Sequence, residues 1–310
     1  MERESDGRRF VVKQLMISVD ELASKVGFAD EVKVMSRFRH PRIVQLYDSY
    51  IEGEVLYILM EYAADGSLYS KIQDAAMKKE HFDEPQILRW FVQIALALKH
   101  VHDHKILHRD VTAKNVFLTS DGHVKLGDFG ISKQLSTQTN LAQTVIGTPN
   151  YLSPEIWQGR AYDAKSDVWS LGCILCEMAS LSPAFRQPDL PSMMHAITNA
   201  SYTTVPEGYS DVIKALVASI LRPNPEDRPT LGQLMKAPVL QKYIIMHAEE
   251  FGSTEEGTSG ALEMDGPSPA PPPAKGGKML RRGSADSGAG GGPRPPPKPT
   301  DGNTFIRKVR

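Results

Sequence analysis

The stretch HRDVTAKNVFLTSDGHVKLGDFG, from His108 to Gly130, decides how this chain is interpreted. It contains two carboxylates, Asp110 and Asp128, with the amide of Asn115 between them. Phosphoryl transfer needs one carboxylate that orients and deprotonates an attacking hydroxyl, and it needs carboxylate and amide oxygens that hold Mg²⁺. The stretch therefore predicts Asp110 as a catalytic base and Asn115 and Asp128 as metal ligands.

Composition and charge narrow the class of protein. The chain has 310 residues, of which 41% are hydrophobic and 24% are charged, and this length suffices for two lobes with cores of their own. A net charge of −1 gives no general attraction to nucleic acid, and no apolar run is long enough to span a bilayer or to form a signal peptide. We therefore expect neither a nucleic-acid partner nor membrane insertion.

The two cysteines, Cys173 and Cys176, lie in an apolar stretch with helical periodicity. A zinc site would need two further ligands nearby, and the sequence offers none there. Buried thiols are the better interpretation, and a reducing, cytoplasmic compartment fits them.

Near the N-terminus, Phe10 to Leu15 (FVVKQL) is typical of a β-strand, and it contains Lys13. The following residues, Ser18 to Phe38, show helical periodicity and include Glu31. A Lys13–Glu31 pair would place the lysine on the α and β phosphates of a nucleotide. An ordinary surface salt bridge is the alternative.

Further strands are predicted at Ile43 to Tyr50 and at Val55 to Tyr62, after which the sequence becomes helical. Seven motifs follow one another in order: RHPRIVQLYDSY, LYILMEY, HRDVTAKN, LGDFGISK, IGTPNYLSPE, KSDVWSLGCILCEM and NPEDRPT. Together they resemble a eukaryotic protein kinase, from about Arg8 to Ile244. The segments QILRWFVQIALALKHVHDHKILHRD and IGTPNYLSPE resemble, more narrowly, the NIMA-related Ser/Thr kinase family.

The resemblance implies an α+β, two-lobed protein kinase fold that transfers the γ-phosphate of ATP to Ser or Thr of protein substrates, with Mg²⁺ as the metal. Residues 1–62 would form part of the β lobe and residues 63–247 the helical lobe. Met60 would lie behind the adenine, although a plain core methionine is the alternative. Backbone groups of Glu61 and Ala63 would bond the adenine edge, and Val11 would cover one adenine face.

Other residues match positions of the family that have a regulatory or a structural role. Thr144 corresponds to the phosphorylated position of the activation segment, where a phosphate would pair with Arg109. Thr148 corresponds to the threonine that contacts the catalytic aspartate Asp110 and indicates Ser/Thr substrates. Three residues match support positions of the family: Glu155 and Arg228 as a buried ion pair, and Asp167 as an anchor of the catalytic-loop backbone. A closing helix is predicted near Leu231 to Ile244.

Two departures from the family pattern leave alternatives open. Thr112 stands where Ser/Thr kinases carry a lysine, and Lys114, four residues after Asp110, would supply the missing positive charge; dual specificity stays open. No G-x-G-x-x-G precedes Lys13 in the printed residues, so the β lobe is expected to be N-terminally truncated. The alternative function is therefore an inactive or weakly active kinase-fold scaffold that lacks the glycine-rich loop.

From residue 248 to residue 310 the sequence is rich in Gly, Pro and Ser. Such a segment buries too little apolar surface to offset its chain entropy, so a disordered tail is expected. Pro293 to Lys298 matches the P-x-x-P-x-K pattern of an SH3 ligand, although this pattern arises easily by chance in a Pro-rich segment. The cytoskeleton and the cilium or basal body are places where relatives act, and the resemblance extends that expectation to this chain.

Overall fold

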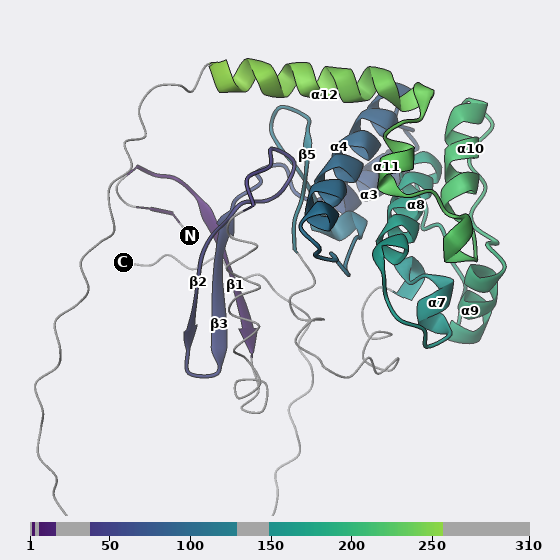
Figure 1. Ribbon diagram of the computed structural model, residues 1–310, viewed down its shortest axis with the longest axis horizontal. Coiled ribbons are helices and arrows are strands. Elements are labelled where there is room, and N and C mark those ends of the chain that lie inside the picture. The colour runs from purple at the N-terminus through teal and green to yellow at the C-terminus, as the bar shows by residue number, and fades with distance from the viewer. Residues whose placement is uncertain (1, 4–5, 17–37, 129–148, 257–310) are drawn as a thin grey trace, which may run out of the picture.

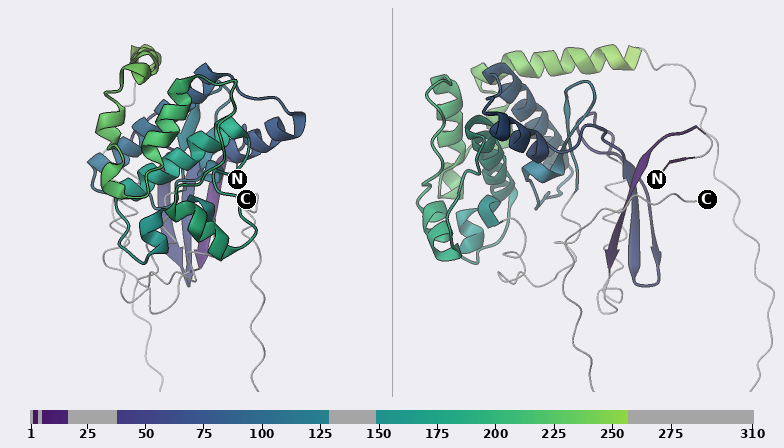
Figure 2. Two further views of the ribbon diagram at one scale, coloured as in Figure 1. Left: turned by 90° about the vertical axis from the view of Figure 1, so that its right-hand side faces the viewer. Right: turned by 180° about the vertical axis from the view of Figure 1, so that it is seen from behind.

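The computed structural model describes residues 2–3, 6–16, 38–128 and 149–256, with side chains up to residue 250. Figure 1 shows a small sheet on one side and a larger group of helices on the other, and Figure 2 shows the same separation from behind. Several predictions concern residues outside the described ranges: the helix at Ser18 to Phe38 with Glu31, the segment with Thr144 and Thr148, and the tail beyond residue 256.

The small sheet consists of β1 (Phe10–Met16), β2 (Leu46–Glu52) and β3 (Val55–Glu61), in the order β1-β3-β2 with antiparallel pairing. The three predicted strands are therefore confirmed, although β2 begins later than Ile43. The reason is that Ile43 forms a bridge with Leu126 in another sheet. Since side chains alternate along a strand, Val11 and Lys13 share one face of β1.

A two-stranded hairpin, β4 (Val116–Leu118) and β5 (Val124–Leu126), joins the two parts of the molecule. Its turn contains Gly122 with φ 80°, a backbone conformation that favours glycine. The Leu126 N–H donates to the Arg42 carbonyl at 2.8 Å, and the Leu118 N–H donates to the Gly66 carbonyl at 2.9 Å. The hairpin thus contacts the chain before β2 and the connection after β3.

The helices form the larger part of the molecule, and α4 (Glu84–Asp103) and α8 (Ala164–Ser180) pack against each other and against several of the others (Figure 1). Asp83 caps the first turn of α4, and Asp163 forms a capping box at the start of α8. α8 is buried along most of its length and contains Cys173 and Cys176, which are free, buried thiols as predicted. The helical elements are α3 (Leu68–Lys78), α4 (Glu84–Asp103), η1 (Ala113–Asn115), η2 (Pro149–Tyr151), α7 (Pro154–Trp157), α8 (Ala164–Ser180), α9 (Leu190–Thr198), α10 (Asp211–Ile220), η3 (Pro225–Asp227), α11 (Leu231–Leu234) and α12 (Pro238–Glu256).

The end of the described chain differs from the prediction of one closing helix. Two helices, α11 and α12, replace it, and α12 continues through Glu256, past the expected end of the helical lobe at residue 247. Composition indicated a disordered chain from residue 248, but α12 packs against α4, and Glu250 forms an ion pair with Arg42. These tertiary contacts outweigh the weak local signal. Within the described ranges no helix combines the length and the apolar character that a bilayer crossing requires.

Candidate functional site

The predicted lysine and metal-ligand carboxylate lie together in the structure. The Lys13 ammonium, on the middle of β1, forms an ion pair with the Asp128 carboxylate, which follows β5. Both side chains are partly exposed, at 26% and 31%. Asp128 has a positive φ of 59°, a backbone conformation that is uncommon for a residue with a side chain. A cation and a carboxylate from opposite parts of the molecule therefore meet at one place.

Asp110 and Asn115 form the second half of the site. The Asn115 Nδ2 donates to the backbone oxygen and to Oδ2 of Asp110, both at 2.8 Å. The Gly127 N–H donates to the Asn115 carbonyl at 2.9 Å, so η1 lies next to the residue that precedes Asp128. The structure thus brings Asp110, Asn115 and Asp128 together, as their order in the sequence suggested.

Gly127 allows the segment before Asp128 to pack closely against its neighbours. A Cβ at this position would meet the Val44 side chain at 2.7 Å and the Phe117 ring at 3.0 Å. No side chain larger than hydrogen fits there without displacing both neighbours. The glycine before Asp128 is therefore required by the close packing of β5 against the rest of the hairpin region.

His108 links the two halves, a role that the sequence analysis did not identify. It is fully buried, its Nδ1 accepts the Asp110 N–H at 3.3 Å, and its Nε2 lies 3.2 Å from the Gly127 carbonyl. Since Nδ1 accepts, the proton belongs on Nε2, which donates to that carbonyl. Burial lowers the pKa of His108, so the ring is neutral. Its two hydrogen bonds join the backbone at Asp110 to the backbone at Gly127.

Asp167 holds the backbone of the catalytic loop from α8. Its carboxylate is fully buried and accepts the His108 N–H at 2.9 Å, the Arg109 N–H at 3.0 Å, and hydrogen bonds from His102 and Tyr162. Burial acts to raise its pKa, but the bond from His102 and the nearby charges outweigh burial, so the pKa is lowered. Asp167 therefore remains ionised and fixes the loop that carries Asp110. Arg109 has φ 63°.

The residues expected to bind adenine lie at the end of β3, in the connection that follows it, and on β1. The Glu61 carboxylate receives the Lys125 ammonium at 2.6 Å and the Gln45 N–H at 3.0 Å, so its side chain is occupied by the protein itself. Met60 lies opposite Val11 in the register of β3 and β1, and both are partly buried. Ala63 is half-buried on the connecting segment. The arrangement is consistent with backbone groups, rather than the Glu61 side chain, facing a ligand.

Thr112 and Lys114, the departures from the family pattern, lie two residues apart at the start of η1 and differ in burial. Thr112 is buried, whereas Lys114 is exposed with its Nζ 5.2 Å from the centre of the Tyr69 ring. The predicted contact of Lys114 with a phosphate stays a prediction. A further support that the sequence analysis missed is Tyr151, whose hydroxyl donates to Glu177 and accepts the Ala113 N–H at 3.4 Å.

Glu155 and Arg228 form a bidentate ion pair away from these residues, with distances of 2.8 and 2.7 Å. The Arg228 side chain is fully buried and also donates to the carbonyls of Arg222, Lys165 and Pro223. Burial acts to raise the pKa of Glu155, but the bonds from Arg228 and Ser166 outweigh it and lower the pKa to about 2. The pair therefore stays charged and joins α7 to the end of η3.

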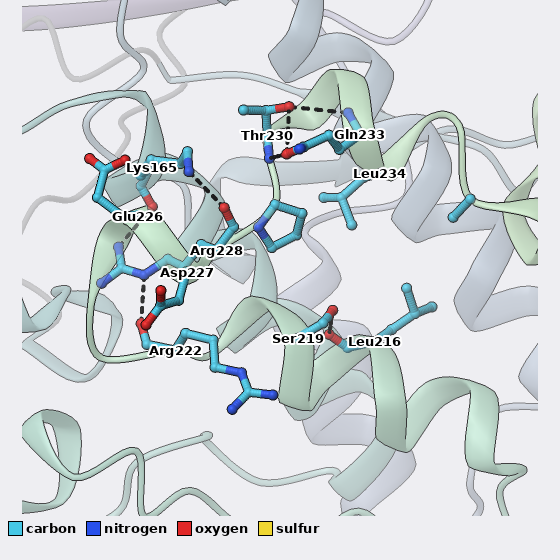
Figure 3. Close-up of a pocket in the computed structure, with 12 residues that line it drawn as sticks. Lys165, Leu216, Ser219, Arg222, Glu226, Asp227, Arg228, Thr230, Gln233 and Leu234 are labelled. Atoms are coloured by element: carbon cyan, nitrogen blue, oxygen red, sulfur yellow. Dashed lines mark hydrogen bonds between the residues drawn. The ribbon is translucent and has the colours of Figure 1, made fainter.

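A cavity of about 720 Å³ adjoins this ion pair. Figure 3 shows its lining, with the Lys165 ammonium on the Arg228 carbonyl and the reciprocal bonds of Thr230 and Gln233. Neither Asp110, Asn115 nor Asp128 belongs to the lining, so the cavity is separate from the carboxylate site.

Comparisons with known proteins agree with the geometry. The family model of the protein kinase domain matches residues 1–240. Nek1, a serine/threonine-protein kinase of Mus musculus, is 42% identical over 266 residues, which make up 86% of this chain and 22% of Nek1. Nek5 of Homo sapiens, also a serine/threonine-protein kinase, is 40% identical over 78% of this chain and 34% of its own length.

A more distant organism provides a third relative. The probable serine/threonine-protein kinase nek3 of Dictyostelium discoideum is 38% identical over 82% of this chain and 23% of its own length. The chain therefore spans about a fifth to a third of the length of these three relatives. From the match to the domain and from these relatives we conclude that the chain belongs to the protein kinase family and resembles its NIMA-related members.

Proposed function

We propose that this chain is the catalytic part of an ATP- and Mg²⁺-dependent protein serine/threonine kinase. The observation that carries the proposal is the meeting of four side chains from separate segments: Lys13 of β1, Asp110 and Asn115 of the catalytic loop, and Asp128 after β5. A fold with a purely structural role has no need of a carboxylate, an amide and an ammonium at one place.

The donor set fits Mg²⁺ and a nucleotide. The Asn115 amide nitrogen is bonded to Asp110, so the atom that it presents to a cation is an oxygen, the ligand type that Mg²⁺ prefers. Asp128 would supply the second oxygen ligand. Lys13, now paired with Asp128, has the charge and the position to bind the phosphates. When bound, Mg-ATP supplies the phosphoryl group and the charge neutralisation that its transfer requires.

Asp110 would orient the substrate hydroxyl and accept its proton. The Asn115 amide fixes one carboxylate oxygen, and the bond of the Asp110 N–H to neutral His108 fixes the backbone. The loop is in turn held by the buried carboxylate of Asp167. The base is therefore held in place by neutral and ionised groups whose charge states do not change near neutral pH.

Serine and threonine are the proposed acceptor residues because the relatives carry that description and because Thr148 matches the family position. Regulation through a phosphate on Thr144 that pairs with Arg109 is part of the proposal. The Nε of Arg109 is buried and has no hydrogen-bond partner among the described residues, which leaves capacity for an anion. The contribution of Lys114, an SH3 partner for Pro293 to Lys298, and a cytoskeletal or ciliary location stay predictions.

Transfer of labelled phosphate from ATP to a generic protein substrate, with identification of the phosphorylated amino acid, tests this function. We expect label on Ser or Thr in the parent chain and a loss of about 10³-fold or more in Asp110→Asn, which keeps the size of the side chain but removes its basicity. Asp121→Asn is the matched control, because it changes an exposed carboxylate in the β4–β5 turn. Equal transfer by the parent and Asp110→Asn would refute the proposed role. Absence of transfer by a folded parent chain would favour the scaffold alternative.

A further inference from the structure

Aromatic rings from three distant parts of the chain gather beside α12. The histidine cluster consists of Phe38 and His40 before β2, His100 and His104 at the end of α4, and His247 on α12. The His40 ring stacks on His247 with centroids 6.3 Å apart and lies 5.0 Å from His100, while His100 lies 4.5 Å from His104. Phe38 meets His100 and His104 edge-on, at 5.6 and 5.0 Å. The cluster therefore joins α12 to α4 and to the segment that leads into the small sheet.

An ionic contact continues this junction one turn further along α12. The Glu250 carboxylate lies 3.3 Å from the Arg42 guanidinium and 3.7 Å from Nδ1 of His123, which follows the β4–β5 turn. The Arg42 side chain is only 9% exposed. The same His123 nitrogen accepts a hydrogen bond from the Gln93 amide of α4 at 2.8 Å, so His123 also joins the hairpin to α4. α12 thus contacts the sheet connection and the hairpin at once, and Figure 1 shows it running past β5 toward the sheet.

The contacted segment leads directly to the candidate site. The Arg42 carbonyl accepts the Leu126 N–H at 2.8 Å, and the Val44 N–H donates to the Leu126 carbonyl at 2.8 Å. Leu126 ends β5, and Asp128 follows two residues later. Residues 42–44 are therefore the link between α12 and the edge that carries Asp128.

We propose that α12 is an acid-releasable clasp, which holds residues 38–44 and the end of β5 in place while the histidine cluster is neutral and dissociates when the cluster takes up protons. The metal-binding role of the edge that α12 holds in place rests on the proposed function. The attachment and release of α12 do not depend on it. Nε2 of His100 and Nε2 of His247 are buried and have no hydrogen-bond partner among the described residues. A proton added there would bring a charge into the junction without an acceptor.

The charged surroundings do not offset such protonation. The titratable and charged groups that face the junction are His40, Arg42, Arg89, Lys99, His100, Asp103, His104, Asp121, His123, Lys125, His247 and Glu250. Burial, together with neighbouring histidines and Arg42, lowers the pKa of His40 and of His247 from 6.5 to about 4, and the Glu250 carboxylate, which acts to raise the pKa of His247, does not offset this. Because the docked pKa lies below the free value, the stabilisation is present above pH 6.5 and is lost as the pH falls toward 4.

Hydrogen–deuterium exchange of the full chain tests the clasp without any need for catalysis. When release of α12 returns one histidine from a pKa of about 4 to the free value of 6.5, the equilibrium constant for release is about 20-fold larger at pH 5 than at pH 7. After correction for intrinsic exchange, we expect residues 238–250 and the Leu126 amide to exchange about 20-fold faster at pH 5. α8 should keep its protection and serves as the internal reference.

Two variants and their controls separate the clasp from general acid sensitivity. Glu250→Gln should accelerate exchange in α12 already at pH 7, whereas Glu80→Gln, at an exposed position after α3, should not. His247→Phe keeps an aromatic ring in the stack and cannot titrate, so it should reduce the pH response severalfold; His195→Phe, on the exposed side of α9, should leave it unchanged. Equal protection of α12 at pH 5 and pH 7, or loss in parallel with α8, would overturn the proposal.

Discussion

At the scale of single residues, buried charges hold the catalytic loop and the helical lobe in place. Glu155 and Arg228 are 3% and 0% exposed, and their two hydrogen bonds hold the carboxylate in its charged form. The pKa of Glu155 is about 2, compared with 4.5 for a free glutamate. Since the folded value is the lower one, the pair stabilises the fold above about pH 4.5 and loses this contribution, about 3 kcal/mol, as the pH falls toward 2.

Arg228→Met should destabilise the protein by about 3–5 kcal/mol at pH 7, because it leaves the Glu155 carboxylate buried without its partner. Urea unfolding at several pH values measures this change. The double variant Glu155→Gln with Arg228→Met buries no charge, so it should lose less stability than the single variant. A single variant as stable as the parent would show that the pair contributes little.

At the scale of the elements, close approach of α8 and α10 depends on Gly172. A Cβ there would meet the Ile220 side chain at 2.5 Å and the Leu221 side chain at 2.9 Å. Gly172→Ala should therefore destabilise the protein by about 1–3 kcal/mol, although alanine favours helices more than glycine does. Gly232→Ala in α11 is the matched control, since its nearest neighbour would lie at 3.9 Å. We expect this change to be neutral or to stabilise by up to about 1 kcal/mol.

Thermal unfolding of the two alanine variants distinguishes packing from propensity. Helix propensity alone would raise the Tm of both variants, whereas the contacts at Gly172 predict a lower Tm for that variant only. A raised Tm for Gly172→Ala would mean that α8 and α10 can move apart without loss of stability and that their close approach is not required.

At the scale of the whole molecule, the sequence identified the parts whose signals are local. Short, β-rich runs predicted the strands that contain Lys13 and Met60, and the motif predicted that Asp110, Asn115 and Asp128 act at one site. The break between α11 and α12 falls at Pro238, a local signal that the sequence analysis did not use. The extension of α12 to Glu256 was not predicted, because it depends on contacts such as Arg42 with Glu250 that join residues far apart in the chain. The same holds for the bond between Tyr151 and Glu177 and for the histidine cluster.

The positions that sequence reasoning left open are those that depend on geometry rather than on residue type. His108 stands inside the catalytic motif, but only its two bonds show which nitrogen carries the proton. Lys114 was predicted to approach a phosphate, and its contact with the Tyr69 ring follows from the direction of η1. Such directions are set by tertiary packing, for which a motif gives no signal.

The most direct test of the central claim, that Asp128 and Asn115 bind the metal of Mg-ATP while Asp110 acts on the substrate, is a thermal-shift titration with ATP in the presence and absence of Mg²⁺. The parent chain and Asp110→Asn should both show a Mg²⁺-dependent rise in Tm, since a ligand at about 100 times its Kd adds about 2.7 kcal/mol of stability. Asp128→Asn should show no Mg²⁺-dependent rise. A rise in Asp128→Asn equal to that of the parent would contradict the assignment of the metal site.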